Sequence, residues 1–316
     1  MIDRWDAERV DRLLSFTGDA DGGVSRVLLS PTAGDRSGRS VDAAMPNDDL
    51  VHFGRPPLSE VALSIQFESL TAFSYAEIGA LRDHFRSSFP RVEYHPPLPP
   101  AFETFGPPSV LTMPFPFPFA SIGGMPRVWL IDEQGVDVLQ FQPDRFTRNW
   151  RKTENDAEYP HYDTVRSTFL SDLHSLAAFL EERKLGGLVP TQCEITYVNQ
   201  LSAPDGYAEL MGRAFSNWRN VRPSVLGESD NVAFNMSFVL SGAEGAPVGR
   251  VYFQATSGFD NAGQRVVHLM VIGRGAPATS TIEGAVDLLD LAHGHIVKSF
   301  LELTTAEIQA EWERRA

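Results

Sequence analysis

The order of strand and helix patterns along the chain is the feature that most constrains its fold. In LSEVALSIQF, the apolar side chains of Val61, Leu63 and Ile65 alternate with small or polar residues, as in a half-buried strand. Further strand patterns come in two groups, at 127–151 and 231–275, and one long helix pattern follows each group. Parallel sheets need a crossover between successive strands, so this order predicts antiparallel sheets.

Apolar positions at three- and four-residue spacing predict three amphipathic helices, at 74–88, 162–184 and 281–300. Thr304 and Glu307 have the spacing of a capping box and predict one more helix after the third. Helices and strands are therefore segregated rather than alternating. This is typical of α+β folds and argues against doubly wound nucleotide-binding folds.

We therefore expect an α+β protein with two halves, each a mainly antiparallel sheet packed against a long helix. The halves are expected at residues 51–202 and 203–316. Residues 1–50 have little periodic hydrophobicity beyond a short helix pattern at the start, so we interpret them as a flexible N-terminal extension with one helix and a mobile tail.

Between these patterns, residues 95–126 carry ten of the 22 prolines of the chain. Proline removes a backbone donor, so this segment is expected to run as an extended connection outside the centre of a sheet. It has two interpretations: a PxxP ligand for an aromatic groove, or a rigid strap whose phenylalanines cover an edge of the core. The phenylalanines concerned are Phe102, Phe105, Phe115, Phe117 and Phe119.

Composition narrows the class of protein. The chain has 27 basic and 41 acidic residues and a formal net charge of -14, which opposes general binding of nucleic acid. Cys193 is the sole cysteine, so no intrachain disulfide can form, and a reducing compartment fits best. Neither a secretory signal nor an apolar run long enough for a membrane span is recognisable. We expect a cytoplasmic protein without membrane contact.

Motifs for common chemistries are missing. The strings GxGxxG, GxxxxGK[ST], GxSxG and HExxH do not occur, so we expect no cofactor and assign no catalytic residue. His293 and His295 are two positions apart, which separates their side chains on a helix and argues against a metal site. Gly273 and Gly275 precede the third helix pattern and fit an ordinary turn better than an anion site. Glu194 lies in a strand with polar alternation partners and is expected to face water.

One short stretch, QFQPDRFTRNWRK at 140–152, is dense in cationic and aromatic side chains. On a strand, one face of it carries Arg145, Asn149 and Arg151, and guanidinium groups flanking an amide suit recognition of an anion. We assign these three residues as candidate anion ligands.

The other face of this stretch carries Arg148, Trp150 and Lys152, which we assign as a candidate interaction surface. Two other roles stay open for the arginines of this stretch. The arginines could pair with nearby acids such as Glu154, Asp156 and Glu158, or they could contact nucleic acid locally, which the overall charge disfavours.

Several strings together resemble an uncharacterised, sporadically distributed family of bacterial cytoplasmic proteins. They are PLSEVALSIQFESL, FPRVEYHPPLPP, QFQPDRFTRNWR with the following YPHY, CEITYVNQL and LAHGHIVKSFLELTTAEIQAEW. QPDRFxxNWR is the most specific element, and the similarity covers about Pro57 to Trp312. The resemblance supplies no catalytic residues. It implies an accessory role in a bacterial defence or toxin-related system.

The absence of catalytic motifs favours a non-catalytic binding protein over an enzyme. Our leading expectation is that the chain engages a protein partner, with a second copy of the chain as a further candidate. The alternative is a pocket between sheet and helix that holds a small molecule or an anionic ligand and that would be compatible with an enzyme.

Overall fold

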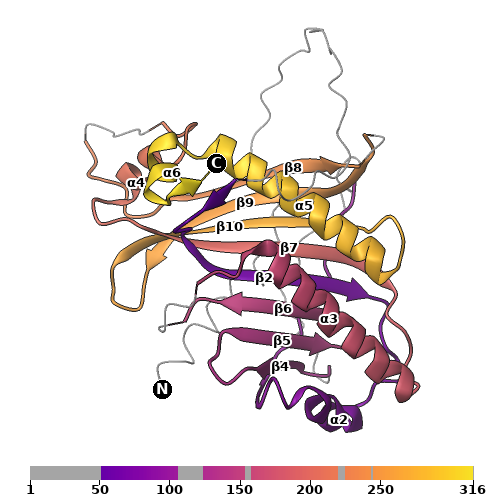
Figure 1. Cartoon of the computed structure of the whole chain (residues 1–316). Helices are drawn as coiled ribbons and strands as arrows, with labels where there is room; N and C mark the ends of the chain where they lie inside the picture. The colour runs from indigo at the N-terminus through magenta and orange to yellow at the C-terminus, as the bar shows by residue number, and fades with distance from the viewer. Residues whose placement is uncertain (1–50, 106–123, 154–157, 220–224, 243–244, 316) are drawn as a thin grey trace.

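The computed structural model describes residues 51–105, 124–153, 158–219, 225–242 and 245–315. The main sheet within these ranges has nine strands in the order β3-β4-β5-β6-β2-β7-β10-β9-β8, and every neighbouring pair is antiparallel (Figure 1). The expected α+β class with a mainly antiparallel sheet and long helices is thereby confirmed. The N-terminal helix and tail expected in the first fifty residues lie outside the described residues.

The first half supplies one edge of the sheet together with two helices. Its elements are β2 (Leu58–Phe67), α2 (Tyr75–Phe85), β3 (Arg91–His95), β4 (Arg127–Ile131), β5 (Asp137–Gln142), β6 (Arg145–Arg151) and α3 (His161–Glu182). The strands β3 to β6 form a meander, and β6 returns to pair with β2. The first and last strands of this half are therefore neighbours.

The second half repeats this order. Its elements are β7 (Pro190–Ser202), α4 (Tyr207–Ala214), β8 (Ala233–Ser241), β9 (Pro247–Phe259), β10 (Arg265–Gly275), α5 (Ile282–Leu303) and α6 (Ala306–Glu311). Here β10 returns to pair with β7, and β7 also pairs with β2. The two halves thus share one continuous sheet, with their first strands side by side at its centre. The expected division between residues 202 and 203 would instead assign β7 to the first half, and it stays a prediction.

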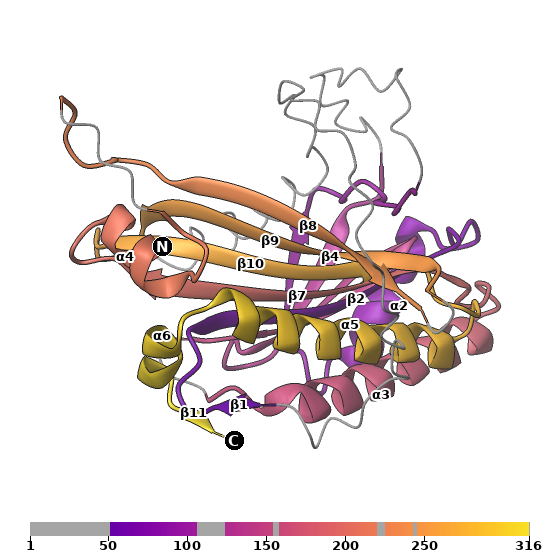
Figure 2. The ribbon, with the colours of Figure 1, turned by 90° about the horizontal axis from the view of Figure 1, so that it is seen from above.

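Both long helices, α3 and α5, cover the same face of the sheet (Figure 2). Val61, Leu63 and Ile65 of β2 are fully buried within the core on this face, as the period-two pattern predicts. Ser64 and Gln66 on the other face are buried too, so the expectation of a half-buried strand is wrong. The core continues into α3, where the ring of Phe169 stacks on that of Phe146 with centroids 6.2 Å apart. We call this the helix face, and we call the other side of the sheet the strap face.

Close packing of α5 against β10 explains why residue 273 is a glycine. A Cβ at Gly273 would lie 2.8 Å from the Cβ of Ala292, which is closer than real contacts allow. The helix begins as expected, because the Thr281 hydroxyl accepts a hydrogen bond from the Gly284 amide at 3.1 Å. The expected N-cap is confirmed, but the expectation that Gly273 and Gly275 form a turn is wrong, because both lie at the end of strand β10 and pair with its neighbours.

Two local predictions need correction. The short helix α4 was not predicted, since it spans only Tyr207–Ala214. The N-cap of α6 is Thr305, whose hydroxyl accepts from the Ile308 amide at 3.3 Å, so the expected cap at Thr304 is wrong by one residue. The Thr304 hydroxyl instead donates to the Phe300 carbonyl at 2.6 Å, at the end of α5.

The described part of the proline-rich segment, residues 96–105, contacts strap-face side chains. The Gln66 amide bonds both the carbonyl and the N–H of Ala101, at 2.7 and 2.8 Å, and Gln142 does the same with Leu98, at 3.0 Å for each bond. Phe102 and Phe105 are exposed, so the idea that these two cover the core is wrong. The other three phenylalanines lie outside the described residues.

Candidate functional site

The candidate anion ligands on β6 share one face, as their spacing predicts, and all three are engaged by the chain itself. Arg145 Nη2 donates to the Pro99 carbonyl of the strap at 3.0 Å. Asn149 donates to Glu60 and accepts from Gln140. Arg151 Nη2 donates to the Gly135 carbonyl at 3.0 Å. They lie on the strap face, away from the helices, and their role as anion ligands stays a prediction.

The residues of the candidate interaction surface lie mostly inside the protein. Arg148 is buried and pairs with Asp137, at 2.8 Å, and with Asp172 of α3. Trp150 is buried in the core, and only Lys152 is exposed. Burial of two of the three side chains counts against a direct contact with a partner. Arg148 thus pairs with Asp137 and Asp172, which are not among the acids expected from the sequence, Glu154, Asp156 and Glu158. Residues 154 and 156 lie outside the described residues.

Glu194 requires a correction, because it does not simply face water. It pairs with Arg274 across the strap face at 2.5 Å, and its side chain is largely buried. Burial alone would raise the pKa of Glu194, but the charges of Arg274 and Arg145 outweigh it and hold the pKa below its usual value.

The pairing extends into the strap. Glu103 lies next to Arg250 at 2.6 Å and to Arg274 at 3.8 Å, and it accepts a hydrogen bond from the Tyr252 hydroxyl at 2.8 Å. These charged groups form an internal network that fixes the strap on the sheet.

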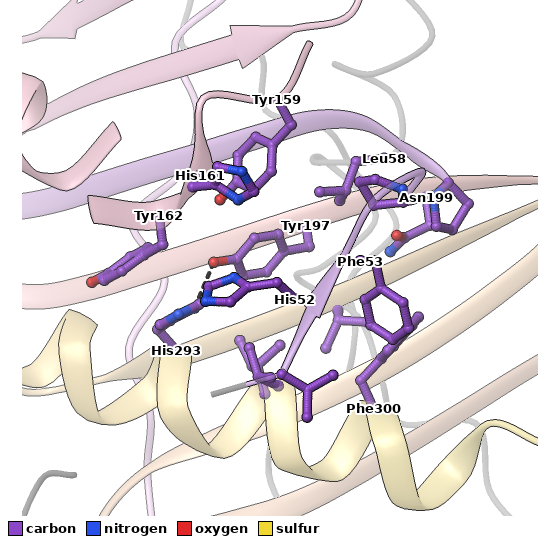
Figure 3. A pocket seen from close by; sticks show the side chains of 16 residues that line it. His52, Phe53, Leu58, Tyr159, His161, Tyr162, Tyr197, Asn199, His293 and Phe300 are labelled. Atoms are coloured by element: carbon purple, nitrogen blue, oxygen red, sulfur yellow. Dashed lines mark hydrogen bonds between the residues drawn. The ribbon is translucent and has the colours of Figure 1, made fainter. Parts of the chain in front are cut away.

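A pocket of about 110 Å³ lies on the helix face, between sheet and helix, and none of the candidate anion ligands Arg145, Asn149 and Arg151 lines it. It opens between β7, β10, the start of α3, the second half of α5 and the segment at 51–58 (Figure 3). Its apolar walls include Phe53, Leu58, Val271, Ile296 and Phe300. This is the arrangement that ligand pockets commonly have, a concave apolar surface with a few polar groups.

The polar end of the pocket is a chain of tyrosine and histidine side chains. The Tyr197 hydroxyl and His293 Nδ1 are 2.7 Å apart, and the His293 ring stacks on Tyr162 with centroids 3.8 Å apart. The Tyr162 hydroxyl donates to Asp290 at 2.8 Å, and Arg166 holds the same carboxylate through two nitrogens. The imidazole is therefore fixed in orientation on both sides.

Burial lowers the pKa of His293 to about 4, in spite of the nearby carboxylates of Asp290 and Asp163. Burial also raises the pKa of Tyr197 well above its usual value. Both groups are neutral near pH 7. A base is most effective when its pKa lies near the working pH, so this histidine is a weak general base, and the arrangement favours binding over acid–base chemistry.

Two further features mark this pocket as unusual. The hydroxyl of Tyr159 is buried and approaches that of Tyr197 without making a hydrogen bond of ordinary geometry. His161, which packs edge-on against His52 at 5.5 Å, has a φ of 64°, a left-handed conformation that is unusual for a residue with a side chain. Strained backbone of this kind concentrates at binding sites.

Sequence reasoning had examined His293 only as a metal ligand, and it missed the tyrosines. His293 packs against Tyr162 and bonds Tyr197, whereas His295 is half-buried on the same helix. The string YPHY at 159–162 could have pointed to the pocket, since it supplies two tyrosines and one histidine to it. Its contact with Tyr197 and His293, far along the chain, is a tertiary property.

Searches of protein-family models, of curated proteins and of solved structures found no match to this chain. The resemblance described from the sequence therefore stays a prediction. Among the described residues, no helix combines the length and the apolar character that a membrane span requires.

Proposed function

We propose that this protein binds a small molecule in the pocket between the sheet and helices α3 and α5. The observation that carries the proposal is an apolar cavity of about 110 Å³ with an ordered cluster of neutral tyrosine and histidine side chains at one end. The pocket is partly open to the surface, and a concave apolar surface with a few polar groups is the usual form of a small-molecule site. The buried Tyr159 hydroxyl, which interacts with that of Tyr197, and the strained His161 lie beside the same space.

The test is a ligand screen on the full chain with a matched pair of variants. Val297 lines the pocket and Lys298 is exposed at the next position of α5. Val297→Phe fills the cavity and is expected to weaken any hit at least tenfold in calorimetry, whereas Lys298→Phe leaves it unchanged. Equal affinity of both variants for every hit would place binding elsewhere and end the proposal.

A second candidate function is contact with another protein chain through the edge strand β8. This strand forms one end of the sheet, and residues 233–241 contain no charged side chain. Phe238 and Val239 are 47% and 57% exposed on it. The opposite edge, β3, is shorter and carries Arg91, Glu93 and His95, which is how proteins usually prevent edge-to-edge pairing.

The partner that such an edge suits best is a second copy, because two identical edges pair antiparallel about a two-fold axis. Light scattering after size exclusion measures this directly. A dimer is expected for the unmodified chain, a monomer for Val239→Lys, and a dimer again for Phe259→Lys, which changes an exposed apolar residue at the end of β9. A monomer at all concentrations of the unmodified chain would contradict the proposal.

A further inference from the structure

The residues that line the pocket define the charge of its ligand. In the part of the chain that the structure describes, sixteen residues line it, and none of them is Asp, Glu, Lys or Arg. The nearby charges of Asp290 and Arg166 are already paired with each other through two hydrogen bonds, at 2.7 and 2.8 Å. A charged ligand would lose part of its hydration here without meeting a carboxylate, ammonium or guanidinium group of opposite charge in the lining. The lining therefore favours a neutral ligand.

The walls define its shape. Eight of the sixteen lining residues are aromatic when histidine is included, and Figure 3 shows their rings arranged around the space. Aromatic rings gain about 0.5–1.5 kcal/mol from offset or edge-on contacts beyond the area that they bury. A dry cavity of about 150 Å³ in another protein is known to hold benzene. The volume of about 110 Å³ therefore suits a compact single ring with few substituents.

The side chain of Asn199 defines the polar group of the ligand. Asn199 lies two residues after Tyr197 on β7, so both side chains project from the helix face into the pocket. Its amide nitrogen donates to the Leu269 carbonyl of β10 at 3.1 Å. This bond uses one of the two N–H groups of the amide, so the second N–H can still donate, and the amide oxygen can accept a hydrogen bond from a ligand. A ligand that satisfies it carries an O–H or N–H donor.

We propose that the pocket takes a neutral, single-ring aromatic compound bearing a hydrogen-bond donor, of the phenol or aniline class. The inference rests on the proposed small-molecule function and adds the chemical class of the ligand. In this complex the Asn199 oxygen accepts the hydrogen bond of the ligand's donor, and Phe53 and Phe300 pack on its ring. His293 and Tyr197 are uncharged and offer an anion no opposite charge.

Matched pairs of probe compounds test the class by calorimetry on the full chain near pH 7.5. Phenol is expected to bind about tenfold more tightly than anisole, and aniline more tightly than N,N-dimethylaniline, because methylation removes the donor. Benzoate and benzylammonium, which carry one charge each, are expected to bind more weakly than phenol by a larger factor.

Asn199→Leu is expected to remove the preference for phenol over anisole while leaving the affinity for anisole within about threefold. If that variant does not fold, the relative affinities of the compounds for the unmodified chain still test the ligand class. If anisole binds as tightly as phenol, or benzoate binds more tightly than phenol, the proposed ligand class is wrong. The small-molecule function would still stand if Val297→Phe weakens this binding. Binding of no compound, with no difference between Val297→Phe and the unmodified chain, would remove the small-molecule function itself.

Discussion

The two faces of the central sheet are both buried, but by different means. On the helix face, apolar side chains of the sheet such as Leu63 and Phe146 pack under α3 and α5. On the strap face, glutamines and charged pairs such as Glu194–Arg274 meet the strap. Antiparallel sheets commonly leave one face to water, whereas here the polar part of that face is covered by the strap and lies beside two small buried apolar clusters, one around Trp129 and one around Met270. The helix face gains its stability from buried area, whereas the strap face depends on pairing, so the two respond differently to mutation and pH.

The largest effect is expected from Phe169→Ala on the helix face. Phe169 is fully buried, and its truncation removes buried area and leaves a cavity, so we expect a loss of about 4 kcal/mol in the free energy of unfolding. Urea denaturation at pH 7 and pH 5 measures it. The loss is expected to be the same at both values, and a loss below about 1 kcal/mol would mean that the helix face is not the main core.

Breaking a charge pair on the strap face is expected to rank second. Arg274→Met keeps most of the side-chain volume but leaves Glu194 without its cation in a largely buried position, at a cost of roughly 3 kcal/mol. Arg86→Met, at an exposed position, is the control and should change stability by less than about 0.5 kcal/mol. Adding Glu194→Gln to Arg274→Met should recover part of the loss. If the double variant is no more stable than Arg274→Met alone, the Glu194–Arg274 pair does not have this role.

A pH effect from the helix face is expected to be somewhat smaller. The pKa of His293 is lowered in the folded protein to about 4 from 6.5, so the unfolded chain binds the extra proton first as the pH falls. Stability is therefore lost between pH 6.5 and pH 4, and the part between pH 6.5 and 5 is about 2 kcal/mol.

Denaturation curves at closely spaced pH values measure this loss for variants of two histidines. His293→Gln should flatten the dependence, whereas His174→Gln, at an exposed position of α3, should retain it. His295, whose pKa burial also lowers, contributes in the same direction. The effect of Glu194 on the strap face can be told apart by its pH range, because its lowered pKa makes stability fall only below about pH 4.5. An equal slope in all three proteins would show that His293 is not the group concerned.

The smallest effect is expected from loosening the strap. Gln66→Ala removes both hydrogen bonds to Ala101 and should cost about 1 kcal/mol. Hydrogen exchange at the Ala101 amide should rise strongly, while the exposed substitution Gln134→Ala leaves it unchanged. Unchanged protection of that amide would mean that other contacts hold the strap.

Local sequence rules predicted the elements well where one physical signal dominates. The alternation around Leu63 located β2, and the cap at Thr281 located the start of α5. The same rules failed for Glu194, since the polar alternation that suggests a water-facing strand also occurs on a strand face covered by another segment. They also failed for Arg148 and Trp150, whose surroundings depend on the packing of α3.

The sequence by itself determined the class of the fold, because hydrophobic period and turn chemistry act over a few residues at a time. It also determined which side chains of β6 share a face. Only the tertiary structure decided which face receives the helices, that the strap contacts the other, and that Tyr159, Tyr197 and His293 meet around one pocket. The reason is physical: contacts between residues about a hundred positions apart depend on how the whole sheet is ordered, and local patterns carry no information on that order.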